Sequence, residues 1–232
     1  MKLFLRTICI TLLLAVPAQH LRAQTVEVAP GVRVTKKTFD APIMEQPFYG
    51  FAEKAPELKA ADEKFIAAVI QVAGTREKAF EETVRRGWSA FFANNIPEAT
   101  RRFNQAFLLD PAQSQIYHGF AIITQVRFND SEYADELFLV ARTRTNPSRN
   151  LNADYGRFLL IVKKPREAQG VLEQAVKDDP DFGTAWSNLG VARFLNGDRT
   201  TACAAADEAA KRDNPENVKA DITILRAQAQ CK

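Results

Sequence analysis

Few residues in this sequence are of types that could do chemistry. After the first 23 residues, His118 is the only histidine, and Cys203 and Cys231 are the only cysteines. A serine or cysteine nucleophile needs a base and a group that orients the base, so any such site would depend on His118 alone. The sequence has no clustered histidine and cysteine ligands for zinc, no phosphate-binding loop and no dinucleotide fingerprint. We therefore expect no enzyme activity, no metal and no cofactor.

Three groups of charged residues could form polar sites. The acidic pairs Glu81–Glu82 and Asp178–Asp179 could in principle act as acid and base, but such pairs are typical of solvated helix surfaces. The cluster of Arg142, Arg144 and Arg149 could bind an anion, but a solvated loop is the favoured interpretation. None of the three groups predicts a reaction.

The first 23 residues have the pattern of a targeting segment. Lys2 and Arg6 begin it, an apolar run covers residues 8–16, and small residues follow at Ala18 and Ala23. This order is typical of a secretory signal peptide, which would span residues 1–23, with cleavage after Ala23 or, alternatively, after Ala18. The run is short for a membrane span. We expect a periplasmic or secreted protein with no stable membrane insertion after cleavage.

The net charge belongs to this leader. The chain has 31 basic and 28 acidic residues, a formal charge of +3. Lys2, Arg6 and Arg22 lie in the leader, which has no acidic residue, so the remaining chain is neutral. A neutral chain has no general attraction for nucleic acid or an anionic membrane, and we expect neither as a partner.

The remaining chain repeats itself at a nearly constant period, which indicates an array of helix pairs. Two small residues recur in steps of 35, 34 and 34, at Ala99, Ala134, Ala168 and Ala202 and at Ala106, Ala141, Ala175 and Ala209. Another recurs in steps of 34, 35 and 34, at Gly87, Ala121, Gly156 and Gly190. A proline closes each unit, at Pro111, Pro147, Pro180 and Pro215. Small residues let antiparallel helices approach closely, and proline ends a helix.

The clearest copy, residues 181–215, resembles a tetratricopeptide repeat. The family spacing W-x2-L-G, then A-x3-A-x2-A, then P is met at Trp186, Leu189, Gly190, Ala202, Ala206, Ala209 and Pro215. The resemblance implies an all-α, right-handed α-solenoid of about four helix pairs, at about residues 80–113, 114–148, 149–182 and 183–215. The other copies depart from the pattern, since Thr83 and Asn152 take the Trp186 place and Arg86 takes the Leu189 place.

Segments outside the repeats should cover the ends of such a stack. Residues 54–79 are predicted to form a helix that leads into the first repeat. In this helix Ala61, Phe65 and Ala68 reproduce the spacing of a repeat's second helix, so we interpret it as a degenerate half repeat that caps the N-terminal end. Residues 216–232 predict a C-terminal capping helix.

Residues 24–53 have no helical period. Alternating valines suggest an extended segment around Pro30 and Gly31, and the stretch ends in Phe48, Tyr49 and Phe51. Chain termini are usually loose unless something holds them. The segment is therefore either a flexible leader whose aromatic end packs on the first helix, or a strap that lies along the array or is offered to a partner.

The two remaining cysteines predict a disulfide. Cys203 lies near the start of its helix and Cys231 near the end of the capping helix, so antiparallel packing of the two helices brings both to the same end of the stack. Disulfides persist in exported proteins, and closing a loop of about 28 residues typically stabilises by about 3–4 kcal/mol. The alternative is two buried, unpaired thiols.

The family resemblance implies a concave groove lined by the first helix of each repeat. Two rows occupy equal repeat positions: Trp88, Ile122, Arg157 and Val191, and Phe91, Gln125, Leu160 and Phe194. His118 and Ser187 share a neighbouring row. These largely apolar rows suit a peptide with apolar anchors, although any one of them could instead pack only between repeats. A lysine and asparagine clamp for a chaperone's terminal carboxylate is not expected, since Asn188 alone fits it.

We therefore predict an exported tetratricopeptide repeat module that binds a protein or peptide partner in its groove, as an adaptor or assembly factor of the cell envelope. The alternative is a structural, self-associating repeat protein whose groove is occupied by its own or a neighbour's N-terminal strap, residues 24–53.

Overall fold

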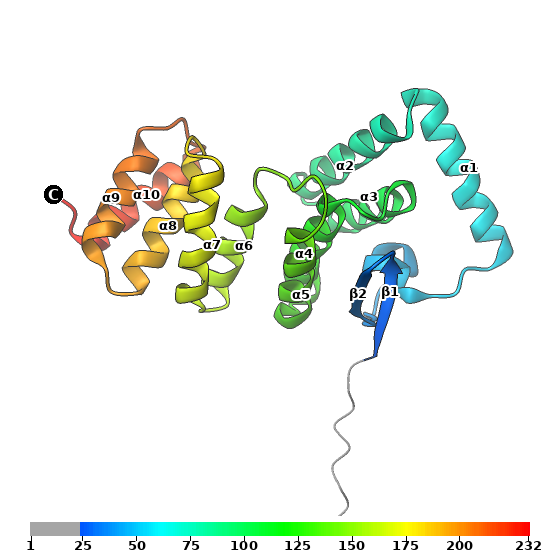
Figure 1. The fold of residues 1–232 in the computed structure, drawn as a ribbon, viewed down its shortest axis with the longest axis horizontal. Coiled ribbons are helices and arrows are strands. Elements are labelled where there is room, and N and C mark those ends of the chain that lie inside the picture. The colour runs from blue at the N-terminus through cyan, green and yellow to red at the C-terminus, as the bar shows by residue number, and fades with distance from the viewer. Residues whose placement is uncertain (1–23) are drawn as a thin grey trace, which may run out of the picture.

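The computed structural model describes residues 24–232 as a row of stacked helix pairs with a small β-hairpin near one end (Figure 1). The predicted signal peptide, residues 1–23, lies outside the described residues. The elements are β1 (Thr25–Ala29), β2 (Val32–Thr35), two 3-10 helices at Ile43–Glu45 and Pro47–Phe51, α1 (Pro56–Ala73), α2 (Arg76–Phe92), α3 (Ile96–Leu109), α4 (Ser114–Phe128), α5 (Ser131–Arg142), α6 (Leu151–Ile161), α7 (Pro165–Asp178), α8 (Gly183–Leu195), α9 (Arg199–Ala210) and α10 (Glu216–Ala229).

Helices α2 to α9 form four antiparallel pairs, so the described chain is an all-α helical repeat. The turn inside each pair contains one residue in the left-handed region, at Asn94, Asn129, Lys163 and Gly197. In three of the four pairs the residue just before the second helix caps it, because its side chain accepts a hydrogen bond from a backbone N–H of the first turn. These capping residues are Asn95, Asp130 and Asp198. Such caps satisfy helix N–H groups that have no partner within the helix.

The small residues of the period lie where helices cross. A Cβ atom on Gly156 would lie 2.3 Å from Leu172 Cγ, and one on Gly190 would lie 2.6 Å from Leu225 Cδ2. No side chain tolerates so short a contact, so glycine lets the large residue of the facing helix fill the space. The core therefore runs continuously through the stack, as the repeat spacing predicts.

Helix α1 corrects the interpretation of a packed half repeat. Ala61 and Ala68 are exposed on α1, whereas the residues with the same spacing on α3, Ala99 and Ala106, are fully buried. No residue of α1 is buried, although Ile66 and Ile70 rest against the core. Figure 1 shows α1 extending away from the other helices at the N-terminal end of the array.

The strap (residues 24–53) is folded onto the array. Strands β1 and β2 pair antiparallel, and the side chains of Val32 and Val34 on β2 are buried. The Phe39 ring then stacks on Phe128 of α4, with 3.9 Å between ring centroids. Farther along, the Phe48 ring lies in the core between α3 and α4, 4.9 Å from the Phe120 ring.

The end of the strap is a left-handed turn that Asn104 holds in place. Phe48, Tyr49 and Phe51 have φ near +55°, beside Gly50 at +60°, a conformation that costs an L-residue roughly 1–2 kcal/mol. The fully buried Asn104 amide donates to the carbonyls of Met44 and Gln46, at 3.0 and 2.8 Å, and its oxygen accepts from Tyr49 N–H at 3.2 Å. The Gln46 carbonyl and Tyr49 N–H also bond to each other at 3.1 Å, so Asn104 reinforces that turn and supplies the partner of the Met44 carbonyl.

The strap does not enter its own groove, which corrects that part of the self-association hypothesis. On α4 it contacts Tyr117 and Phe120 and, near the end of the helix, Arg127 and Phe128. The predicted groove residue Ile122 lies roughly 160° around the helix from Phe120 at about 100° per residue. The other partners of the strap lie on α3, on α5 and at Asp130 just before α5.

The opposite end of the array is covered by α10, which packs on α8 and α9. The predicted disulfide joins Cys203 on α9 to Cys231 just after α10, with the two Cα atoms 5.5 Å apart. Arg226 of α10 also pairs with Asp207 of α9. Within residues 24–232, no helix is both long enough and apolar enough to cross a membrane.

Candidate functional site

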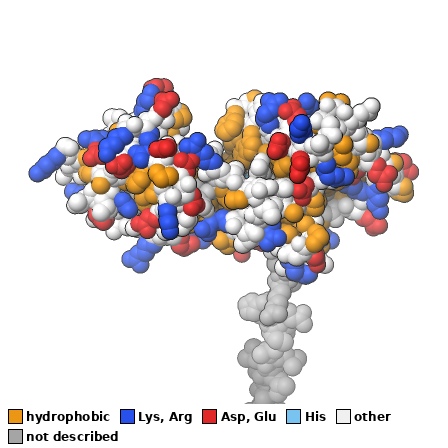
Figure 2. Space-filling model, turned by 45° about the horizontal axis from the view of Figure 1, so that its top comes forward, with side chains coloured by type: hydrophobic (Ala, Val, Ile, Leu, Met, Phe, Trp, Pro, Cys, Tyr) orange, Lys and Arg blue, Asp and Glu red, His pale blue; other side chains and the backbone are white. Residues whose placement is uncertain are grey.

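The two predicted rows lie along the first helices of the four pairs, and most of their side chains are half-buried. Arg157 is the exception, since its side chain is 49% exposed. Figure 2 shows hydrophobic side chains at the surface of both halves of the molecule, interspersed with charged ones. The rows form different surfaces in the N-terminal half (residues 24–142) and the C-terminal half (residues 151–232).

In the C-terminal half, four predicted residues line one open cleft of about 360 Å³. These are Arg157 and Leu160 of α6 and Val191 and Phe194 of α8. The third wall is helix α10, which contributes Asp221, Ile224, Leu225 and Gln228; Ile161, Asn188 and Leu195 complete the lining. We call these residues the C-terminal cleft. Helix α10 lies outside the repeats, so the repeat pattern did not predict this wall.

The polar groups of the cleft lie at its margin. Arg157 Nη1 is 3.8 Å from an Asp221 carboxylate oxygen, and both side chains are more than 40% exposed. An exposed pair at this distance contributes little to stability. The guanidinium therefore remains available to another acceptor, while the cleft itself is mainly apolar.

In the N-terminal half, the rows form an aromatic cluster instead of a cleft. The Trp88 ring lies edge-on to Phe103 at 5.2 Å and to Phe91 at 6.0 Å between ring centroids, and it is stacked near Phe92 at 6.2 Å. Trp88 is thus partly a packing residue. Phe91 and Phe92 give this end of the groove its apolar surface.

The middle of the groove is less open to a ligand than the sequence suggests. The Gln125 amide oxygen accepts from Ser131 Oγ at 2.8 Å, and its nitrogen lies 3.5 Å from Asn129. Gln125 therefore holds the turn between α4 and α5. Ile122 of the same helix is half-buried beside it.

His118 does not line the groove, contrary to the prediction. It is 1% exposed, and its ring centroid lies 5.0 Å from that of Trp88 and 5.9 Å from that of Phe138. Its Nδ1 is 2.9 Å from Ser148 Oγ and its Nε2 is 3.1 Å from an Asp154 oxygen. A carboxylate only accepts, so Nε2–H donates to Asp154 and Nδ1 accepts from Ser148.

This Ser–His–Asp set ties the second repeat to the third. Both imidazole nitrogens are engaged, and the Trp88 and Phe138 rings pack near the imidazole. In a Ser-His-Asp triad the serine faces Nε2 and the carboxylate faces Nδ1, whereas here Nδ1 faces Ser148 and Nε2 faces Asp154. The tie explains the presence of a buried histidine in an apolar core.

Ser187 is also buried, at 1% exposure, and it does not line the groove either. Asn188 beside it is buried too, and its amide lies 3.4 Å from the Ala153 carbonyl. The Asn188 amide thus links α8 to α6 at the inner side of the cleft, and Ser187 is enclosed in the packed interior.

A third apolar row was missed from the sequence. The last turn of each first helix has a large apolar residue that is prominently exposed, by 77, 57, 60 and 55% at Phe92, Val126, Ile161 and Leu195 respectively. These positions are spaced by 34, 35 and 34, like the glycine and alanine of the crossing points. The same arithmetic, shifted by one residue from Phe91, would have identified them.

What this surface offers chemically is binding. In residues 24–232, no three histidine, cysteine, aspartate or glutamate residues lie close enough to hold a metal ion. The exposed row and the C-terminal cleft together present an apolar surface with a few polar groups at its edge, which is the usual composition of a site for an apolar segment.

The comparisons with known proteins agree with this architecture. Residues 163–218 match a tetratricopeptide repeat family model. The match covers α7, α8 and α9, and the helical pairs of the described chain have the fold of a tetratricopeptide-like helical repeat. No curated protein matches the sequence.

Solved structures resemble the chain over most of its length. PilF of Pseudomonas aeruginosa has 20% identity and a TM-score of 0.59, covering 67% of this chain and 71% of its own. A tetratricopeptide repeat protein of Thermus thermophilus has 18% identity and a TM-score of 0.54, covering 64 and 82%. PilW, a widely conserved type IV pilus biogenesis factor, has 17% identity and a TM-score of 0.52, covering 77 and 89%. At these identities the likeness establishes the fold.

Proposed function

We propose that this protein is an exported interaction module whose groove binds an apolar segment of another protein, as an adaptor or assembly factor of the cell envelope. The C-terminal cleft carries the proposal, because helices from three places in the sequence converge on one open apolar surface there. The exposed row, from Phe92 to Leu195, extends that surface over four repeats.

Export is supported by two independent features. Residues 1–23 have the order of a secretory signal peptide, and the Cys203–Cys231 disulfide is of a kind that persists in oxidising compartments. PilW shares the fold and is a pilus biogenesis factor, so this architecture serves assembly of a surface structure in another protein. A periplasmic adaptor is consistent with these features.

The double variant Ile161→Glu/Leu195→Glu tests the groove. Both side chains are more than half exposed, so charge there should leave the fold intact while disfavouring an apolar ligand. The matched control is Val72→Glu/Leu139→Glu, which places the same charges on apolar residues outside the groove, 89 and 49% exposed.

The measurement is crosslinking and affinity capture from the native envelope fraction, with quantification of each captured protein. We expect a partner whose recovery falls about tenfold with the groove variant and is kept by the control, since a disrupted central contact typically costs at least that much. Equal recovery with both folded variants would reject the groove as the binding surface.

A further inference from the structure

The C-terminal cleft continues into a positively charged rim. Leu195 lines the cleft and also a neighbouring hollow of about 400 Å³, whose other lining residues are Lys163, Lys164, Pro165, Arg166, Glu167 and Asn196. We call Lys163, Lys164 and Arg166 the cationic rim. It comprises the turn between α6 and α7 and the first turn of α7, and the same hollow has one acidic residue, Glu167.

This charge is particular to the third repeat. The corresponding turns are Asn94–Asn95, Asn129–Asp130 and Gly197–Asp198, which are neutral or acidic. The third turn has two lysines in the same two places. The rim is therefore more positively charged than the three corresponding turns, and it lies beside the C-terminal cleft.

One of the three cations is already engaged. Lys164 Nζ lies 3.1 Å from an Asp135 carboxylate oxygen and 3.7 Å from Glu167, and the hydrogen bond to Asp135 raises the pKa of this lysine. Within residues 24–232, neither Lys163 nor Arg166 forms an ion pair. Two positive charges at the edge of an apolar cleft thus lack an acidic partner.

Resting on the proposed function, we propose that the segment bound in the C-terminal cleft is acidic as well as apolar. Its large apolar side chains occupy the space between α6, α8 and α10, and carboxylates of the same segment pair with Lys163 and Arg166. Complementary charge of this kind selects among partners more than it adds affinity. A basic segment with the same apolar residues would be repelled.

The probe is a set of three fluorescein-labelled synthetic peptides with identical leucine and phenylalanine residues. The flanking residues are all glutamate in the first, glutamine in the second and lysine in the third. Fluorescence anisotropy with the complete mature chain measures each affinity. We expect the glutamate peptide to bind about fivefold more tightly than the glutamine peptide, the scale of exposed ion pairs, and this difference to shrink in about 0.5 M salt.

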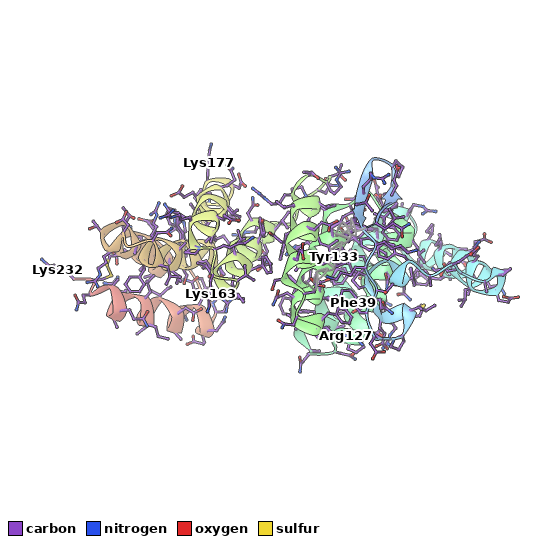
Figure 3. All side chains as sticks on the ribbon, turned by 90° about the horizontal axis from the view of Figure 1, so that it is seen from below. Phe39, Arg127, Tyr133, Lys163, Lys177 and Lys232 are labelled. Atoms are coloured by element: carbon purple, nitrogen blue, oxygen red, sulfur yellow. A yellow bond between two sulfur atoms is a disulfide. The ribbon has the colours of Figure 1, made fainter. Side chains whose placement is uncertain are left out.

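Two variants assign the difference to the rim. In Lys163→Asn/Arg166→Gln, asparagine restores the residue type found in two other turns, so the fold should be kept while the preference for glutamate disappears. The matched control is Lys177→Gln, an exposed lysine at the other end of α7; Figure 3 labels Lys163 and Lys177 on opposite sides of the C-terminal half. The control should keep the preference.

The outcomes separate this inference from the proposed function. If the peptides bind equally well, and binding is lost in Ile161→Glu/Leu195→Glu, the groove stands and the acidic preference is wrong. If none of them binds, the groove function itself fails. Loss of the preference in the Lys177 control, or rim-dependent binding of vesicles with anionic lipid in place of any peptide preference, would also overturn the proposal.

Discussion

The two ends of this array are covered in different ways. At the N-terminal end the strap reaches across α3, α4 and α5, and its central contacts join residues 55 to 60 positions apart in the sequence. At the C-terminal end the cover is α10, which follows α9 directly and is joined to it by a disulfide over 28 residues. The first cover depends on buried hydrogen bonds, and the second on apolar packing and a covalent bond.

The difference shows how a repeat array can protect its ends with unlike chemistry. A stacked array needs a cover because its terminal repeats would otherwise expose core surface. The strap is an irregular segment, so its backbone groups need partners, which the side chains of Asn104 and Gln46 supply. Helix α10 satisfies its own backbone and only has to hold its apolar side against α8 and α9.

The largest effect should follow from removing the buried amide under the strap. Asn104→Leu removes three hydrogen bonds to the strap and leaves the Met44 carbonyl without a partner, while Tyr49 N–H and the Gln46 carbonyl keep their bond to each other. We expect a loss of about 3–5 kcal/mol in the free energy of unfolding. Hydrogen exchange over residues 39–51 should rise strongly. Asn196→Ala, an exposed asparagine of the other half, is the control. Unchanged exchange in the strap would show that Asn104 does not hold it.

Breaking the disulfide should destabilise the opposite end. Cys203→Ser/Cys231→Ser is expected to lower the free energy of unfolding by about 3–4 kcal/mol, because the unfolded chain regains its freedom. Hydrogen exchange should rise in α10 while the strap keeps its protection. Reductant should reproduce the loss in the native protein and have no effect on the double variant. Equal loss of protection at both ends would mean that the two covers are not independent.

Acid should loosen the strap. The Glu45 carboxylate accepts from Arg127 at 2.6 Å and from Arg101 at 2.5 Å. The Arg127 hydrogen bond, with further help from both guanidinium charges, holds the pKa of Glu45 below its usual 4.5. The folded carboxylate therefore binds a proton more weakly than the unfolded one, so its stabilisation is complete above pH 4.5 and is lost as the pH falls through the lower, folded pKa.

Hydrogen exchange of the strap as a function of pH tests this expectation. In the native protein, opening of the strap should become easier below pH 4.5, after correction for the intrinsic exchange rate. Glu45→Gln should already be looser at neutral pH and should lose that part of the pH dependence. Glu63→Gln on α1 is the control. A native pH profile in the Glu45 variant would contradict the assignment.

The smallest effect should come from the turns. Lys163 has a φ of +62° where the fourth repeat has Gly197, and left-handed backbone is costly for lysine. We expect Lys163→Gly to raise the free energy of unfolding by about 0.5–1 kcal/mol and Gly197→Lys to lower it by about as much. A Cβ on Gly197 meets nothing within 4 Å, so urea unfolding of the pair reports the backbone alone. Destabilisation in both would indicate that Lys163 is tied into the fold.

The regular part of the fold was predictable because its signal is local and repeated. Small residues at constant intervals, such as Gly156 and Gly190, mark the crossings of neighbouring helices, and the structure places them there. The disulfide followed from the same regularity, since adjacent antiparallel helices fix which of their ends meet. Helix α1 imitates the pattern of a second helix, but it has no first helix to pair with, and its alanines stay exposed.

The candidate groove was only partly predictable. Row positions identified Leu160 and Phe194 on the cleft, but not the wall that α10 adds, because α10 lies outside the period. Equal spacing also grouped His118 and Ser187 with the surface residues, although both turn inward. Burial depends on what the neighbouring repeat presents to each side chain, and a single row cannot show that.

By itself, the sequence determined the helical pairs and their order, because close helix crossings need small residues at fixed intervals. It also predicted that Cys203 and Cys231 meet at one end of the stack. The tertiary structure alone decided where the strap lies, which side of α4 is free, and how α10 closes the cleft. Those features join segments with no common period. They depend on long-range contacts such as those of Asn104, which no local pattern announces.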